Sequence, residues 1–205
     1  MDKFVTLKGA AAPLMLANVD TDCIIRMERL SRLARGELGP WAFEALRYLP
    51  DGSENPQFIL NQAPWRGASI LLAAENFGCG SSRETAVWAL WELGVRCVIA
   101  PSFGDIFYGN CFQSGMLPVR LPAAEVAALA AEAASGAREI TVDLQAQRIV
   151  TAAGRAIAFD IDPRRRAALL QGLDAIGLTL QHAADIEAFQ ARERQLRPWL
   201  YRAPL

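Results

Sequence analysis

Residues 69–121 alternate short apolar runs with helical runs. The pattern predicts strands at 69–73, 96–100 and 117–121, with helices at 82–93 and 105–114. Gly94 and Gly115 follow the two helices, where a chain commonly leaves a helix through a left-handed residue. Strands joined through helices are normally parallel neighbours, so we expect an α/β fold with a largely parallel sheet.

The connection between the first of these strands and the following helix is rich in small and polar residues. It runs from Glu75 to Glu84 and contains Gly78, Gly80, Ser81, Ser82 and Arg83. A turn that opens a helix directs backbone N–H groups and a positive dipole end at one point. A hydroxyl held there can be stabilised as an anion, and a guanidinium can bind a carboxylate through two hydrogen bonds. The turn suits chemistry on a small carboxylic acid, although an ordinary tight turn with an N-cap has similar residues.

The rest of the chain is predicted to belong to the same domain, which we place at residues 1–205. Extended pieces at 4–7 and 14–16 precede a polar turn, and an excursion at about 26–66 contains helical pieces at 28–35 and 41–48. An irregular segment of that length is usually mobile or functional. Further elements are predicted as a helix at 125–134, short strands within 139–160, a helix that begins at Asp162-Pro163, and a last helix at about 183–196.

Composition excludes several classes of protein. The 205 residues are 52% hydrophobic and 21% charged with a net charge of −1, so we expect neither a nucleic acid nor a membrane surface as partner. Neither a signal-peptide pattern nor an apolar run of the ~20 residues that span a bilayer is visible. The four cysteines (Cys23, Cys79, Cys97 and Cys111) are widely spaced, so we expect a cytoplasmic protein with reduced thiols and no metal bound by this chain.

Four segments in order resemble one family. They are NVDTDCII at 18–25, NFGCGSSRE at 76–84, SFGDIFYGNCF at 102–112 running on to Pro118, and FDIDP at 159–163 with GLDAIGLTL at 172–180. Together they resemble the small subunits of 3-isopropylmalate dehydratases, the isomerases of leucine biosynthesis. The likeness covers nearly the whole chain. It implies a three-layer β/β/α swivelling domain of the kind that forms the aconitase C-terminal domain.

The resemblance also implies a partner and a reaction. In that family the large subunit holds a [4Fe-4S] cluster on three cysteines, and the two chains form a heterodimer in which this chain binds no cofactor. The sequence has one histidine, His182, so an imidazole acid or base near the Ser-Ser-Arg turn would come from the partner. The implied reaction is dehydration and rehydration of a 2-hydroxy dicarboxylic acid, which interconverts 2-isopropylmalate and 3-isopropylmalate.

Site roles follow from the matching positions. The resemblance implies that Ser81 is the catalytic base, as an alkoxide, that Ser82 hydrogen-bonds the substrate and that Arg83 binds a carboxylate in two-point fashion. Asp22 is expected to support the site by orienting Arg83 or the serines. We also expect the excursion to contact substrate, with Arg26 and Arg47 as the substrate-binding candidates.

The chain departs from the usual family sequence at three positions near these residues. Thr85 replaces a histidine, Val87 replaces a proline, and Arg26 replaces another proline. An added arginine favours an additional carboxylate, whereas an apolar contact favours an isopropyl group. Substrates left open are therefore isopropylmalate, citramalate, a dimethylmalate and a homoaconitate-type acid. A non-catalytic swivel or regulatory subunit is the remaining alternative.

Overall fold

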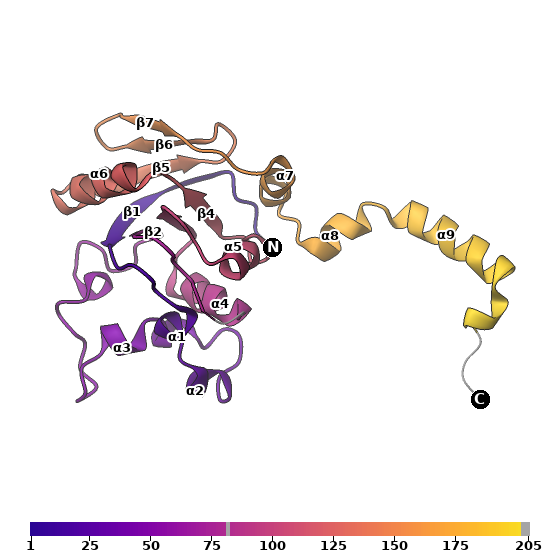
Figure 1. Cartoon of the computed structure of the whole chain (residues 1–205), viewed down its shortest axis with the longest axis horizontal. Coiled ribbons are helices and arrows are strands. Elements are labelled where there is room, and N and C mark those ends of the chain that lie inside the picture. The colour runs from indigo at the N-terminus through magenta and orange to yellow at the C-terminus, as the bar shows by residue number, and fades with distance from the viewer. Residues whose placement is uncertain (81–82, 202–205) are drawn as a thin grey trace.

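The computed structural model describes residues 1–80 and 83–201, and the strands of these residues form one mixed sheet (Figure 1). The strand order is β4-β3-β2-β1-β5-β6-β7. The strands are β1 (Thr6–Leu14), β2 (Ile70–Ala73), β3 (Cys97–Ala100), β4 (Leu117–Arg120), β5 (Glu139–Asp143), β6 (Arg148–Thr151) and β7 (Ala156–Ala158). Strands β1 to β4 pair in parallel and β1, β5, β6 and β7 pair antiparallel, so the expected α/β class is confirmed. The expected largely parallel sheet holds only for β1 to β4, because hairpin-connected strands extend the sheet on the other side of β1.

Strand β1 joins the two halves of the sheet. Its second half, Ala11 to Leu14, pairs with β2, and its first half, Thr6 to Ala10, pairs with β5. Gly9 lies beside the change of partner, where an added Cβ would come 2.1 Å from the Ser69 hydroxyl oxygen. The prediction of two separate extended pieces was wrong, because small residues of low strand propensity continue the strand once both neighbours pair with it.

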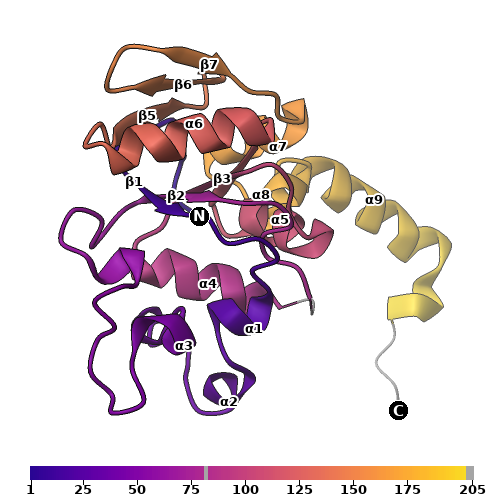
Figure 2. The same cartoon turned by 60° about the vertical axis from the view of Figure 1, so that its left-hand side comes forward.

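The parallel strands are covered on both faces, and Figure 2 shows α4 and α6 on opposite sides of the sheet. Helices α4 (Glu84–Leu93) and α5 (Asp105–Gln113) share one buried cluster with Leu71 and Ala73. Helix α6 (Ala123–Ala134) shares a second cluster with Ile70, Leu72 and the antiparallel strands. Alternate residues of β2 therefore enter opposite cores, which explains why its sequence is apolar without interruption. The predicted α4 and its end at Gly94 are confirmed, as are β2, β3, β4 and α5 to within a residue or two.

The excursion at 26–66 is more irregular than predicted. It contains α2 (Met27–Leu30), η1 (Gly39–Trp41), α3 (Glu44–Arg47) and η2 (Ile59–Asn61), which follow α1 (Thr21–Ile24). The two helices predicted here were wrong in length, since each described helix has four residues or fewer. Gly36 and Phe43 both have positive φ angles, 103° and 57°, and each interrupts the helical repeat.

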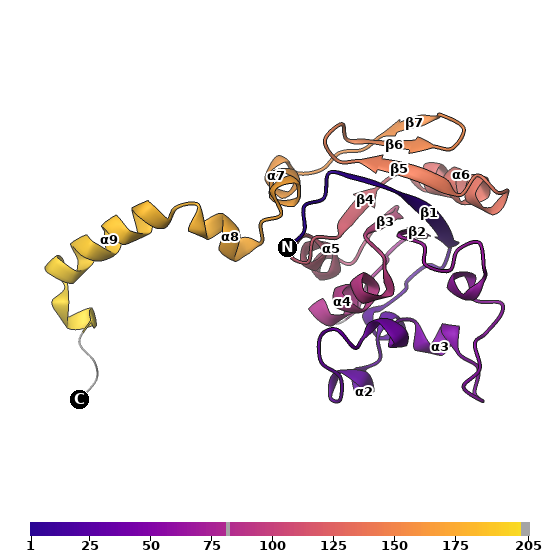
Figure 3. The same cartoon turned by 180° about the vertical axis from the view of Figure 1, so that it is seen from behind.

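A C-terminal arm leaves the body of the molecule (Figures 1 and 3). Helix α7 (Pro163–Gln171) begins at Asp162, whose side chain accepts hydrogen bonds from two backbone N–H groups, as predicted. Beyond it lie α8 (Ala175–Leu180), which was not predicted, then α9 (Ala183–Leu196) at the expected position, and η3 (Pro198–Tyr201). The arm exposes a series of large apolar side chains, namely Ile176, Leu180, Phe189, Leu196, Trp199 and Leu200. No helix among residues 1–80 and 83–201 is long and apolar enough to cross a membrane.

We expect Leu71→Ala to lower the free energy of unfolding by about 2–5 kcal/mol, because it would open a cavity between β2 and α4. Leu71 is 0% exposed. The matched control is Leu16→Ala, at a leucine that is 42% exposed and should cost little. Urea denaturation measures both, and equal losses for the two variants would contradict this description of the core.

Candidate active site

Three loops meet where the parallel strands β1, β2 and β3 end. Gly78 N donates to Val19 O at 2.7 Å, and Thr21 N donates to Cys79 O at 2.9 Å. On the other side, Gly104 N donates to Phe77 O at 2.9 Å. Carboxyl ends of parallel strands share one edge of a sheet, and ligands of open α/β sheets bind outside that edge. Residues 77–79 of the turn are therefore fixed between the two neighbouring loops.

Particular residues make this close meeting possible. Asn18 and Asn76 both have positive φ angles, 53° and 60°, and Asn76 Nδ2 donates to Asn18 Oδ1 at 2.8 Å. Gly78 has φ 72°, and an added Cβ there would lie 2.2 Å from the Phe107 ring. At Gly104 an added Cβ would lie 2.5 Å from Gly78 O. The close contact therefore requires glycine at both positions. At Gly78 the positive φ angle is a second reason for glycine.

Arg83 lies directly after the turn, at the N-cap of α4, and reaches across to α1. Its Nη1 donates to Asp22 Oδ1 at 2.8 Å and its Nη2 donates to Asp22 Oδ2 at 3.5 Å. The Arg83 side chain is 15% exposed and that of Asp22 is 55% exposed. Two of the five N–H donors of the guanidinium face the carboxylate, and the other three make no hydrogen bond to residues 1–80 or 84–201. The structure thus brings together two of the residues that the sequence proposed for the site.

Besides Arg83 and Asp22, the two motifs contain the expected serines and a further acidic residue, Asp20. Ser81 and Ser82 lie outside the described residues. Asp20 caps α1, with its Oδ1 accepting from Cys23 N at 2.6 Å, so its carboxylate has a structural role.

The two arginines of the excursion point to different places. Arg26 is exposed and, with Tyr48 and Leu49, lines a pocket of about 400 Å³. Arg47 is turned away from that pocket lining, because its Nη1 donates to the carbonyl oxygens of Gly39 and Pro40 at 3.3 and 3.2 Å. Of the two, Arg26 is therefore better placed to meet a ligand at the pocket.

A second pocket of about 490 Å³ adjoins the first and shares Tyr48 and Leu49 in its lining. Arg29, on its wall, pairs with Glu44, and its guanidinium carbon lies 3.5 Å from the centre of the Trp41 ring. The hydrogen bond from Arg29 holds the pKa of the Glu44 carboxyl below its usual value. Sequence reasoning missed Glu44, since a carboxylate fifteen residues away carries no local sign that it pairs with Arg29.

The cysteines differ in their surroundings. Cys97 and Cys111 are fully buried, and burial raises the pKa of both thiols. Cys23 and Cys79 are partly accessible beside the loops. Among residues 1–80 and 83–201, no group of three or more Cys, His, Asp or Glu comes together in a way that could hold a metal ion.

Comparisons with known proteins agree on one family. The protein-family model for the aconitase C-terminal domain matches residues 1–124. The model for the C-terminal domain of the 3-isopropylmalate dehydratase small subunit matches residues 176–203. A further model, described as LeuD_N, matches residues 127–163.

Among curated proteins, the chain is 53% identical over 200 residues to the 3-isopropylmalate dehydratase small subunit of Gluconacetobacter diazotrophicus, covering 97% of each chain. It is 50% identical over 201 residues to that of Roseobacter denitrificans, covering 98% of this chain and all of the relative. The crystal structure of 3-isopropylmalate dehydratase from Methanocaldococcus jannaschii superposes with a TM-score of 0.64 at 25% identity, over 92% of this chain and 99% of that one. These matches confirm the expected aconitase-type fold.

We expect Gly78→Ala to destabilise the protein by more than the roughly 1 kcal/mol that a positive φ angle costs a residue with a side chain. The extra loss reflects the overlap of the new Cβ with Phe107. Gly52→Ala is the control, because Gly52 also has a positive φ (84°) but nothing lies within 4 Å of an added Cβ. Thermal unfolding compares the two, and equal shifts would mean that the close contact at Gly78 is unimportant.

Proposed function

Because the chain belongs to the family of 3-isopropylmalate dehydratase small subunits, we propose that it forms half of the hydro-lyase that interconverts 2-isopropylmalate and 3-isopropylmalate in leucine biosynthesis. The observation that carries the proposal is the identity of 50–53%, which extends over nearly the full length of both chains. The second half is a large subunit, with which this chain forms a cytoplasmic heterodimer.

The chain's own contribution begins with the substrate carboxylate. The guanidinium of Arg83 has three N–H donors that are not bonded to a described residue, and Asp22 fixes the plane of the guanidinium. A carboxylate next to the carbon that loses its proton gains negative charge as the reaction proceeds. A guanidinium already oriented toward it stabilises that charge without having to reorganise.

Proton removal is assigned to Ser81, with Ser82 as a hydrogen-bond donor to the substrate. A serine hydroxyl is a weak base in water, so the turn must stabilise its anion strongly. The nearby N-terminus of α4 and the positive charge of Arg83 both favour an anion at this position. These roles rest on the family resemblance and on the position of the two serines immediately before Arg83.

The cluster belongs to the partner. The described part of this chain offers no set of ligands for it, and Cys97 and Cys111 are buried within the cores. A [4Fe-4S] cluster held by the large subunit would supply Lewis-acid chemistry toward the substrate hydroxyl. The active site is therefore shared, with the three-loop edge of this chain facing the large subunit.

Substrate choice is assigned to the excursion. The pocket that contains Arg26, Tyr48 and Leu49 also has the Glu44 carboxylate in its lining, where Arg29 pairs with it. Arg26 beside apolar side chains suits a dicarboxylate carrying a small branched alkyl group. The same mixture leaves citramalate, a dimethylmalate and a homoaconitate-type acid as competing substrates. A purely structural or regulatory subunit has no need of the Arg83–Asp22 pair, which argues against the non-catalytic alternative.

We expect the chain, co-expressed with its large subunit and assayed without oxygen, to turn over isopropylmalate faster than the other three acids. Ser81→Ala should lower kcat by about 10²–10⁴-fold, the range for loss of a general base. Turnover of a different acid, lost in the same variant, would correct the substrate and keep the reaction class. A tight complex whose activity is unchanged by Ser81→Ala would contradict the proposed base.

Asp22→Asn should raise KM for the carboxylate substrate by roughly 10–100-fold, because losing a hydrogen bond to a charged group costs about 1.5–3 kcal/mol. The asparagine amide can accept only one of the two Arg83 hydrogen bonds, so the guanidinium loses its fixed plane. Glu139→Gln is the control, since Glu139 forms an exposed ion pair with Lys8 at 2.8 Å in the antiparallel half of the sheet, away from the three-loop edge. Steady-state kinetics of the wild-type enzyme and both variants measure KM. A KM for Asp22→Asn equal to that of the wild type would show that Asp22 does not support substrate binding.

A further inference from the structure

Glu92 occupies a position in α4 that normally disfavours a carboxylate. It is the last residue but one of the helix, where the helix dipole presents its negative end. Three backbone N–H groups of the excursion nevertheless donate to it. Gly36 N lies 2.7 Å from Oε1, and Leu38 N and Gly39 N lie 2.5 and 3.0 Å from Oε2. Successive N–H groups that converge on one anion in this way form a strong, charge-assisted contact.

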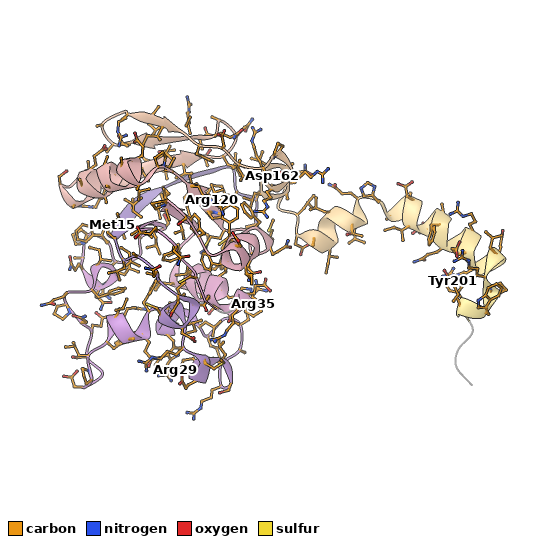
Figure 4. The ribbon with its side chains drawn as sticks, in the orientation of Figure 1. Met15, Arg29, Arg35, Arg120, Asp162 and Tyr201 are labelled. Carbon is orange, nitrogen blue, oxygen red and sulfur yellow. The ribbon has the colours of Figure 1, made fainter. Side chains whose placement is uncertain are left out.

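The contacting segment lies directly on α4. We call residues 35–39 the strap. At its end, an added Cβ on Gly39 would lie 2.7 Å from the Glu92 carbonyl carbon, and Leu38 is buried in the core beside α4. At its start, the Arg35 guanidinium stacks 4.7 Å from the centre of the Trp88 ring, and Figure 4 shows Arg35 beside this helix. The strap thus follows α4 over one turn, between Trp88 and Glu92.

The strap continues into the wall of the larger pocket. Pro40 comes directly after it, and the Pro40 carbonyl oxygen accepts hydrogen bonds from the Tyr48 hydroxyl at 3.1 Å and from Arg47 Nη1 at 3.2 Å. Pro40 and Tyr48 both line the 490 Å³ pocket. A continuous series of contacts therefore runs from the Glu92 carboxylate through Gly39 and Pro40 to Tyr48.

We infer that Glu92 is a positioning residue for substrate binding, which sets the distance between the pocket wall and Arg83. Both are fixed to one rigid helix, because Arg83 is the N-cap of α4 and the strap is held at Glu92, eight residues after Glu84 and about 12 Å along the axis. The inference rests on the proposed function, which assigns substrate choice to the excursion. It places the substrate's alkyl end in the 490 Å³ pocket, which shares Tyr48 and Leu49 with the pocket of Arg26.

The effect of losing this contact should fall on binding. The pocket wall touches the same part of the substrate before and during the reaction, so a displaced wall weakens ground state and transition state alike. The turn lies at the opposite end of α4 and keeps its own contacts with Asp22 and Val19. We therefore expect KM to rise while kcat stays nearly constant.

The test uses Glu92→Gln in the assembled two-subunit enzyme, with Glu187→Gln on the exposed face of α9 as the matched control. The glutamine keeps the shape of the side chain, but its NH₂ group opposes one of the backbone donors. We expect KM for isopropylmalate to rise about tenfold with kcat within about twofold, as for loss of a charge-assisted hydrogen bond. Trypsin should also cut after Arg35 faster than in the wild-type enzyme, because the strap is released.

Gly39→Ala gives a second, independent disturbance of the same contact, since its Cβ would push the strap away from Glu92. It should reproduce the rise in KM and the faster cleavage after Arg35. Unchanged KM and unchanged cleavage in both variants of an active enzyme would overturn the inference, as would a loss confined to kcat. If the wild-type enzyme acts on none of the acids, the proposed function fails, and the rate of cleavage after Arg35 still tests whether Glu92 holds the strap.

Discussion

The site depends on a close backbone contact between loops that follow three parallel strands. Gly78 donates to Val19 O and packs against Phe107, and its carbonyl oxygen lies close to Gly104, whose N–H donates to Phe77 O. Any side chain at Gly78 or Gly104 would separate the loops. With the turn fixed this way, α4 can begin immediately after it, and the positions of Arg83 and Asp22 follow from the backbone.

The Arg83–Asp22 pair contributes more to the orientation of the Arg83 guanidinium than to the stability of the fold. Ion pairs with an exposed partner typically contribute about 0–1 kcal/mol, and the Asp22 side chain is 55% exposed. A planar guanidinium held at two points, however, has a defined direction for its remaining donors. The same reasoning applies to Glu92, whose position near the helix C-terminus is explained by the loop that it holds rather than by α4 itself.

Much of the fold could be predicted from the sequence, because its central elements obey local rules. Gly94 ends α4, Asp162 and Pro163 begin α7, and the apolar runs mark β2 and β3. The excursion could not be predicted in this way. Its helices are four residues or shorter, and it is held by distant partners, as in the pair Arg29–Glu44 and the strap on Glu92. For the site, the two motifs indicated Arg83 and Asp22, which form a hydrogen bond in the structure. The direction of the Arg47 side chain is set by its hydrogen bond to the Pro40 carbonyl oxygen, which residue spacing in the sequence does not predict.

The central claim is that the three-loop edge is this chain's half of an active site shared with the large subunit. Hydrogen–deuterium exchange of the full chain, alone and in the complex, tests it most directly. We expect slower exchange on complex formation at residues 18–22, 76–80 and 102–106, with a further decrease when substrate is added. Protection confined to the β6–β7 hairpin, with exchange at the three loops unchanged by partner and substrate, would contradict the account.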